Sequence, residues 1–262
     1  MAQAMASTSA DKINYYDDKK HNYVDFWVGR DYEHESELIA INKLLKNRHY
    51  KLAMDYGGGY GRLTPIITRY ADEVILVDPS VKQLNLAKKQ LTGLAVRFVI
   101  QEKKDNVPAK DASIDLLVMI RVSHHLPDPR PVIAEINRVL RPGGEALIEI
   151  ANEAHFVNRL RYIKHFKNVP KEPVPIGVHA NGNEDSTPFV NHNPVTIEQA
   201  FVELGLQRIG KLSVSNFRHR LLKQHIPVKA LLLGERSLQR PLSVINFGPS
   251  IFLLFKKPEN KR

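Results

Sequence analysis

Residues 53–63 constrain this chain more than any other stretch. The short apolar run 52–54 predicts the end of a buried strand. Asp55 follows it, glycines then occupy the alternate positions 57, 59 and 61, and a helical pattern begins at Leu63. Glycine permits a sharp turn and a close approach of the backbone to a ligand, because it has no Cβ. A strand, a glycine turn and a helix amino terminus predict a nucleotide-type site in a doubly wound sheet.

The spacing of the glycines excludes two common phosphate motifs. The dinucleotide fingerprint G-x-G-x-x-G fails, because Arg62 or Thr64 stands where its third glycine belongs. A phosphate loop needs Gly-Lys-Ser/Thr, which this chain lacks. Two alternatives stay open, namely a glycine turn that holds no ligand and a different nucleoside-type ligand in the same fold.

A second acidic residue follows the next predicted strand. The apolar run 74–77 leads to Asp78, which comes 23 residues after Asp55. A carboxylate at this point of a βαβ unit can accept hydrogen bonds from both ribose hydroxyls. Ser80 and Gln83 have the spacing of a capping box that opens the following helix. The alternative is that Asp78 merely precedes that helix.

The pattern from Asp55 to Gly61, acidic-x-G-x-G-x-G, resembles the first motif of class I S-adenosylmethionine (SAM)-dependent methyltransferases. The likeness continues at Asp78, at 124–126 (His-His-Leu) and at 141–144 (Arg-Pro-Gly-Gly), and it is nearest to the small-molecule, methyltransferase type 11-like branch. It covers residues 50–151 closely and 195–256 loosely. The resemblance implies SAM as the cofactor. It implies cofactor contacts from residues at the strand ends, namely Asp55, Tyr56, Gly57, Gly58, Gly59, Gly61, Asp78, Pro79, Glu102, Lys103, Ile120 and Arg121.

One position departs from the family pattern. After the third strand, predicted over 96–100, the family carries an acid or amide that reads the adenine amino group. Here Lys103 stands at that position, between Glu102 and Asp105. Glu102, Asp105 or backbone amides are the alternatives for holding the adenine.

The resemblance implies one α/β domain over residues 11–262, after a disordered tail at 1–10. Its fold is a doubly wound, Rossmann-like sheet of seven strands, mostly parallel with the last strand antiparallel, and helices on both faces. The SAM-binding core is expected over 51–154. Its predicted elements are a strand at 114–120, a helix with Val132, Ile133, Ile136, Val139 and Leu140 on one face, a turn at 141–144 and a strand at 146–151.

The final helix and edge strands are expected at 195–214 and 250–256. Thr196 and Gln199 have the spacing of a capping box that starts this helix, and Gly205 marks its end. The edge strands are predicted over 206–214 and 250–256.

Three segments outside this core are expected to cap the substrate. Residues 11–50 are rich in aromatic rings, at Tyr15, Tyr16, Tyr23, Phe26, Trp27 and Tyr32. They predict a lid in which Arg30 and Tyr32 face the site, or a simple cover for the core edge. Residues 155–194 are expected to be irregular. Residues 215–249 contain two basic amphipathic helices, over 219–226 and 228–239.

His124 and His125 are the candidates for catalysis beside the cofactor. An imidazole has an ordinary pKa near 6.5, so it can accept a proton from a nucleophile near neutral pH. The alternatives are that these side chains only shape the pocket, or that positioning alone suffices. Further from the core, His179, His192 and His219 could meet the substrate. The histidine spacing suggests no metal site, and the absence of cysteine excludes thiolate ligands.

The net charge of +10 comes entirely from residues 155–262, which hold 17 Lys and Arg against 7 Asp and Glu. This asymmetry fits an anionic substrate, nucleic acid or a lipid surface, or a solvated surface that leans basic. No apolar run reaches the length of a membrane span, and a cytoplasmic protein is expected.

The favoured function is methyl transfer to an oxygen, nitrogen or carbon atom of a small organic molecule. The alternatives are an RNA or protein methyltransferase, a non-catalytic SAM-binding protein, and a membrane-surface contact through residues 219–239. For those helices, covering a pocket is the favoured interpretation.

Overall fold

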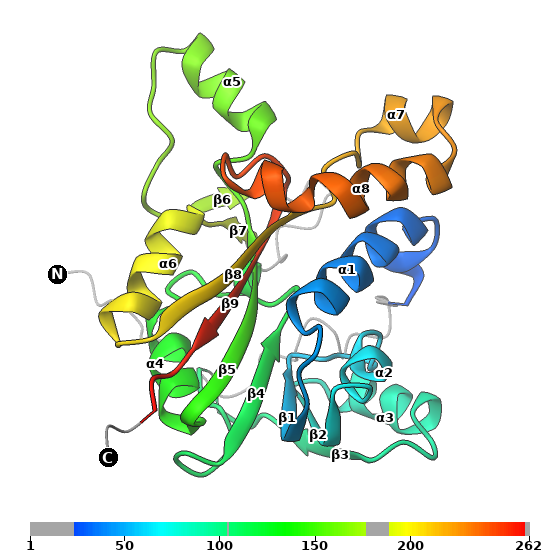
Figure 1. Ribbon diagram of the computed structural model, residues 1–262, viewed down its shortest axis with the longest axis vertical. Coiled ribbons are helices and arrows are strands. Elements are labelled where there is room, and N and C mark those ends of the chain that lie inside the picture. The colour runs from blue at the N-terminus through cyan, green and yellow to red at the C-terminus, as the bar shows by residue number, and fades with distance from the viewer. Residues whose placement is uncertain (1–23, 104, 177–188, 260–262) are drawn as a thin grey trace, which may run out of the picture.

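The computed structural model describes residues 24–103, 105–176 and 189–259. Its central sheet has seven strands in the order β3-β2-β1-β4-β5-β9-β8. The first five are parallel, and β9 runs antiparallel to both β5 and β8 (Figure 1). The predicted seven-strand, mostly parallel sheet is therefore confirmed. The strands are β1 (Tyr50–Tyr56), β2 (Ala71–Asp78), β3 (Val96–Ile100), β4 (Ile114–Met119), β5 (Leu140–Ala151), β8 (Gln207–Val214) and β9 (Ser250–Lys256).

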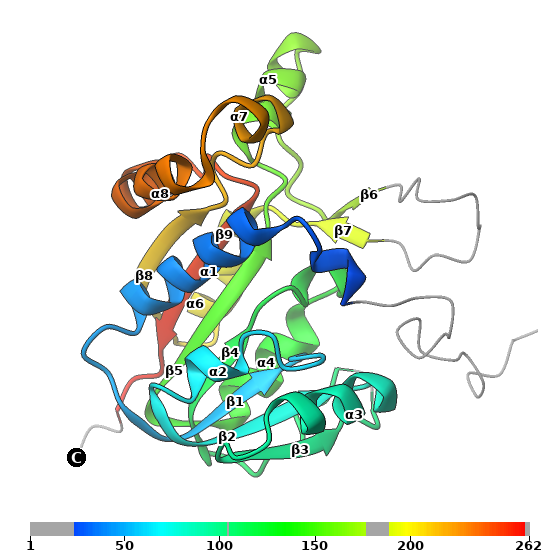
Figure 2. The same cartoon turned by 90° about the vertical axis from the view of Figure 1, so that its right-hand side faces the viewer.

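Helices cover both faces of this sheet (Figure 2). Helices α4 and α6 pack on one face, and α1 and α2 pack on the other. Helix α3 packs against β2 and β3. The helices are α1 (Asp31–Leu44), α2 (Thr64–Ile67), α3 (Val81–Gln90), α4 (Arg130–Val139), α5 (Phe156–Lys164), α6 (Pro194–Glu203), α7 (Arg220–His225) and α8 (Val228–Ser243). Two 3₁₀ turns, η2 (Asp25–Trp27) and η3 (Ser123–His125), and a small sheet of β6 (Val174–Ile176) and β7 (Phe189–Asn191) complete the described elements.

The central strand β4 shows why the core is apolar on both sides. All six of its residues are buried. Leu117 and Met119 pack with α4 on one face, whereas Leu116 and Val118 pack with α1 and α2 on the other. Successive side chains of a strand point to opposite faces, so a strand covered on both faces must be apolar nearly throughout.

Two predicted boundaries on the core were wrong. Strand β5 begins at Leu140, so the Arg-Pro-Gly-Gly stretch at 141–144 lies inside it and is not a separate turn. Long-range pairing draws the stretch into the sheet, since Gly143 donates its N–H to the carbonyl oxygen of Lys257 at 2.9 Å. Helix α6 begins two residues before Thr196, because the side chain of Asn193 caps it by accepting from the N–H of Val195. The predicted end near Gly205 is confirmed.

The segment 155–194 was expected to be irregular, and this was also wrong. It contains α5, β6 and β7, although residues 177–188 lie outside the described part of the chain. Pairing with β7 makes β6 a strand, and a three-residue pairing leaves little local signal in sequence. The insertion 215–249 does form two helices, and α8 continues to Ser243, four residues beyond the predicted end.

Candidate functional site

The glycine turn after β1 has the backbone that its sequence predicts. Gly57, Gly59 and Gly61 have φ values of +72°, +57° and +83°, in the left-handed region that other residues rarely adopt. A Cβ built on Gly57 would lie 2.3 Å from Cγ2 of Val122. Position 57 therefore requires glycine for its conformation and for its close approach to the segment after β4.

Asp55 is buried at the end of β1 and binds the next helix. Its Oδ2 accepts a hydrogen bond from the Thr64 hydroxyl at 2.7 Å. Burial raises the pKa of Asp55 to about 6. This carboxyl group lies against the turn, since a Cβ on Gly58 would lie 2.8 Å from it. Asp55 thus joins β1, the turn and α2.

Asp78 is buried at the end of β2, where its carboxylate supports the same turn. Oδ2 accepts from the N–H of Gly59, and Oδ1 accepts from the N–H of Ser80, both at 2.9 Å. The Ser80 hydroxyl in turn accepts from the N–H of Gln83. Ser80 therefore caps α3 as predicted, while Asp78, and not the Gln83 side chain, holds the Ser80 N–H.

A small hollow opens between the ends of β1 and β4. It is lined by Asp55, Gly57, Gly58, Arg62, Leu63, Ile120 and Arg121. Five of these residues were predicted cofactor contacts from two stretches over 60 positions apart. They meet because β1 and β4 are parallel neighbours, so their carboxyl ends share one edge of the sheet.

Glu37 of α1 binds two residues that line this hollow, Arg62 and Arg121, and sequence reasoning missed it. Its side chain is fully buried and pairs with Arg62 at 2.6 Å and with Nε of Arg121 at 2.7 Å. Burial acts to raise the pKa of Glu37, but the guanidinium groups of Arg121 and Arg62 outweigh it, and the pKa is lowered. An acid on the buried face of an otherwise amphipathic helix, between Tyr32 and Ile41, was the available signal.

The residues of the predicted lid, 11–50, that the structure describes lie in different places. Trp27 lies at the hollow, with the Arg62 guanidinium 3.4 Å from the centroid of its ring. The Arg30 guanidinium carbon lies 3.6 Å from the centroid of the Phe26 ring. Tyr32 does not face the site: its hydroxyl donates to Oε1 of Glu235 at 2.5 Å, so it joins α1 to α8. Tyr15, Tyr16 and Tyr23 lie outside the described residues.

The turn after β3 is organised by Gln101. Its side-chain amide donates to the Tyr56 hydroxyl at 2.7 Å and to the carbonyl oxygen of Asn106 at 3.0 Å. The Tyr56 side chain is consequently part of the core. Glu102 and Lys103 are exposed at the start of this turn, as is Pro79 after β2. Gly61 packs against α3, where an added Cβ would lie 2.6 Å from Leu91.

His124 and His125 lie side by side on η3, with their rings tilted by 44° to each other. Their ring centroids are 4.1 Å apart, and the ring of Phe189 on β7 lies 5.0 and 4.9 Å from them. Although both imidazoles keep some solvent contact, burial lowers the pKa of His124 well below its ordinary value and that of His125 to about 4. Both rings are therefore neutral at pH 7. From the sequence, groups with a pKa near neutrality were expected.

The other predicted histidines do not join this pair as free groups. His192 is buried, and its Nε2 lies 2.9 Å from the carbonyl oxygen of Ser123. His219 caps α7 through the N–H of Leu221, and His179 lies outside the described residues. Within the described ranges, no cluster of three or more His, Asp or Glu side chains is arranged to hold a metal ion.

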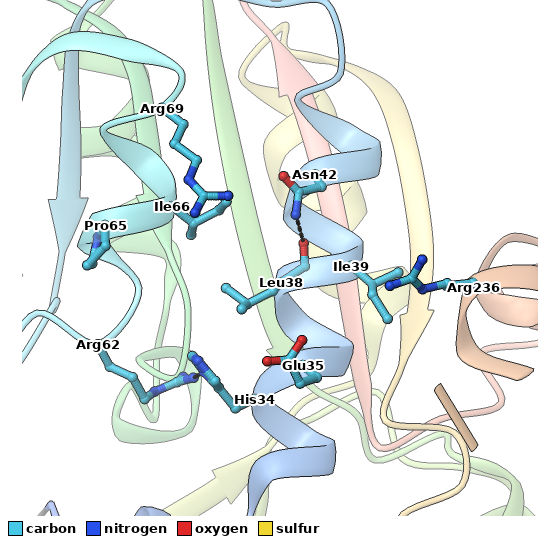
Figure 3. A pocket seen from close by; sticks show the side chains of 10 residues that line it. All are labelled: His34, Glu35, Leu38, Ile39, Asn42, Arg62, Pro65, Ile66, Arg69 and Arg236. Carbon is cyan, nitrogen blue, oxygen red and sulfur yellow. Dashed lines mark hydrogen bonds between the residues drawn. The ribbon is translucent and has the colours of Figure 1, made fainter. Parts of the chain in front are cut away.

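A larger groove of about 400 Å³ lies on the flank between α1 and α2 (Figure 3). His34, Glu35 and Arg62 line one end of it. Leu38, Ile39, Asn42, Pro65, Ile66, Arg69 and Arg236 complete its walls. Arg62 is shared with the hollow, but none of the glycines of the turn lines this groove. Its position thus separates it from the predicted cofactor contacts.

Comparison with known proteins places this geometry in context. Residues 54–148 match a family model described as a methyltransferase domain. The chain is 25% identical over 215 residues to the tRNA 5-carboxymethoxyuridine methyltransferase of Escherichia coli K12, covering 79% of this chain and 80% of that protein. It is 28% identical over 182 residues to the demethylmenaquinone methyltransferase of Lactobacillus johnsonii, covering 63% and 73%.

Solved structures share the fold. A Listeria monocytogenes protein described as a SAM-dependent methyltransferase superposes with a TM-score of 0.62 at 15% identity, covering 87% of this chain and all of that one. At that identity the likeness concerns the fold, and it agrees with the strand order found here. Among the described helices, none has the length and apolar character needed to cross a bilayer.

Proposed function

We propose a substrate class for this chain, which carries a class I SAM-dependent methyltransferase domain and uses SAM as its cofactor. The methyl acceptor is an oxygen, nitrogen or carbon atom of a small organic molecule. The observation that carries this proposal is the wall of three rings, His124, His125 and Phe189, beside the hollow. Such a wall offers an uncharged surface of mutually tilted rings to a compact substrate, and the inserted segment 155–194 supplies one of its rings.

The residues around the hollow fit SAM. The Asp78 carboxylate accepts from the N–H groups of Gly59 and Ser80 and is thereby fixed at the end of β2, where a carboxylate can bind a ribose. Gly57 and Gly58 present backbone without side chains, and Ile120 and Arg121 form the opposite wall. When bound, SAM supplies an electrophilic methyl group on a sulfonium. The chain's own part is to hold the acceptor close and in line, and to exclude water.

The histidine pair is proposed to position the acceptor and not to act as an efficient general base. A base works best when its pKa lies near the operating pH, and the pKa of His125 is about 4. A neutral imidazole still accepts or donates one hydrogen bond at each nitrogen. This arrangement favours acceptors that are nucleophilic without losing a proton to the protein.

A second candidate substrate is RNA. The Escherichia coli relative, which covers 79% of this chain, is a tRNA methyltransferase by name, and the carboxy-terminal half of the chain is basic. RNA binding through these cations should weaken steeply as salt increases, because counterions are released on binding. A small-molecule acceptor predicts a much weaker salt dependence.

The test begins with calorimetric titration of SAM and of its demethylated product. Asp78→Ala should weaken binding about ten- to a hundredfold, since a ribose contact is worth on the order of 1–3 kcal/mol. Asp72→Ala, at an exposed position near the start of the same strand, is the control and should bind normally. Loss in Asp78→Ala alone supports the cofactor contact. No binding by folded wild-type protein contradicts it.

The substrate class is then tested with methyl transfer from labelled SAM. Small-molecule pools and bulk tRNA are compared at 50 and 200 mM salt. Transfer to tRNA only, with strong salt dependence, would overturn the small-molecule proposal.

A further inference from the structure

Helix α8 has its polar and apolar sides reversed relative to an ordinary surface helix. Its buried residues are Leu231, Glu235, Gln239 and Ser243, three of them polar. Glu235 accepts from the Tyr32 hydroxyl, and Gln239 donates to the backbone carbonyl of Ser36 at 2.9 Å. Leu233, about 200° around the helix from Leu231, is 65% exposed. The helix is therefore held to α1 by polar contacts and presents apolar surface outward.

Helix α5 presents apolar surface in the same way. None of its residues is buried, so it does not serve as a core helix. Phe156, Leu160 and Ile163 are spaced at i, i+4 and i+7 and lie on one side. Ile163 is 68% exposed and Phe166, just after the helix, is fully exposed. Exposed leucine, isoleucine and phenylalanine clustered on one element are typical of an interaction surface.

Helices α5 and α7 lie at the same edge of the sheet, and α7 leads directly into α8. Helix α5 follows β5, and α7 follows β8. Because β5 and β8 are each antiparallel to β9, their carboxyl ends share one edge, which is also the edge of the glycine turn. Figures 1 and 2 both show α5 and α7 projecting from this end of the molecule.

Cations accompany these apolar residues, and one of them, Lys223, pairs with Glu33 of α1 at 3.0 Å. Residues 155–171 contain five Lys and Arg and no Asp or Glu, and residues 215–234 contain four and none. On α5 the apolar side is flanked by Arg159 and Lys164, about 60° and 80° away. On α8, Lys229 lies on the same side as Leu233, about 40° away. Apolar side chains edged by cations are the pattern of a helix that lies in the headgroup layer of an anionic membrane.

We propose that α5, α7 and the outward side of α8 form a docking face for an anionic phospholipid bilayer. The cations meet the lipid headgroups, and Leu160, Ile163 and Leu233 enter the boundary of the acyl region. Leu160, Ile163 and Leu233 are exposed aliphatic side chains, which cannot stack on bases, and they favour a bilayer over RNA. This proposal differs from the expectation that the helices over 219–239 cover a pocket. It does not depend on the substrate proposed above.

The test is sedimentation of the full chain with vesicles of phosphatidylcholine, with and without phosphatidylglycerol. Wild-type protein should sediment with the anionic vesicles and be released by added salt. Leu160→Asp and Leu233→Asp should each lower vesicle affinity by about tenfold, through loss of a buried apolar side chain and gain of a repelled charge. The matched control is Leu94→Asp, because Leu94 is exposed just before β3, at the opposite edge of the sheet.

Circular dichroism of each variant separates loss of docking from loss of fold. Failure of folded wild-type protein to sediment with anionic vesicles overturns the proposal. An equal loss in Leu94→Asp also overturns it, because the effect would then not belong to this face. Binding to an RNA oligonucleotide without vesicle binding would replace the bilayer with RNA as the partner.

Discussion

The two sides of the site are built from different chemistry. On the cofactor side, buried carboxylates bind charged or polar partners. Glu37 pairs with Arg62 and Arg121, and Asp78 accepts hydrogen bonds from the N–H groups of Gly59 and Ser80. On the acceptor side, the wall consists of His124, His125 and Phe189, and burial keeps its histidines neutral. A buried charge beside an opposite charge retains its ionised form, whereas burial favours the neutral form of an imidazole.

This difference separates two tasks. The Asp78 carboxylate fixes the backbone of the glycine turn and Glu37 fixes two arginines of the hollow, which suits the binding of one invariant cofactor. Neutral rings impose little directional preference and can serve an acceptor whose identity is set by shape. The following predictions test this division, beginning with the largest expected effect.

Gly57→Ala should weaken SAM binding by at least about a hundredfold and destabilise the fold by about 3 kcal/mol. The new Cβ would meet Val122 at 2.3 Å, in a backbone with φ of +72°. Calorimetry and urea unfolding measure the two effects. Gly93→Ala is the control, because its φ is +85° but nothing lies within 4 Å of its added Cβ. Gly93→Ala should lower the free energy of unfolding without weakening SAM binding.

A rescue variant sharpens this prediction. Combining Gly57→Ala with Val122→Ala removes the methyl group that the new Cβ meets, so part of the lost affinity should return. If the double variant binds no better than Gly57→Ala, the contact with the segment after β4 is not the cause.

Glu37→Gln should lower the free energy of unfolding by about 3 kcal/mol, because it leaves two partly buried guanidinium groups without their fully buried carboxylate. SAM affinity should fall with it, since Arg62 and Arg121 line the hollow. Urea denaturation of Glu37→Gln and of Glu35→Gln, an exposed position on the same helix, makes the comparison. Equal stability of the two variants would show that the paired charges contribute little.

The acceptor side should respond to pH. His125 has a folded pKa of about 4 against an ordinary value of 6.5, so the unfolded chain binds a proton first as pH falls. This contribution to stability is present above pH 6.5 and is lost as pH falls towards 4. When the pH is lowered from 7 to 5, the free energy of unfolding should therefore fall by about 1–2 kcal/mol less in His125→Gln than in wild type. Urea unfolding at each pH measures this difference.

Activity distinguishes positioning from base catalysis in the same variant. A positioning role predicts that kcat of His125→Gln falls less than about a hundredfold, which is the lower range for removal of a general base. A larger loss, together with an unchanged pH dependence of stability, would mean that His125 takes the proton and that the acceptor side is not a neutral wall.

Local pattern was sufficient for the parts of this protein whose partners are near in sequence. The seven strands, the turn at Gly57, the cap at Ser80 and the position of Asp78 could all be predicted, because periodicity, glycine conformation and short-range hydrogen bonds determine them. The starts of β5 and α6 could not be predicted. Strand β5 begins at Leu140 because it pairs with a strand that is distant in sequence, and α6 begins after Asn193 because this residue caps it one turn before the expected cap at Thr196.

Tertiary structure decided which charges are paired and which rings are neutral. Glu37 and Arg121 are 84 positions apart in the sequence, and His125 and Phe189 are 64 positions apart. No local sequence pattern therefore predicts either contact. The same is true of Tyr32, whose expected place at the site was taken over by a hydrogen bond to Glu235. Desolvation and long-range electrostatics depend on what surrounds a group in space, and only the folded chain specifies that.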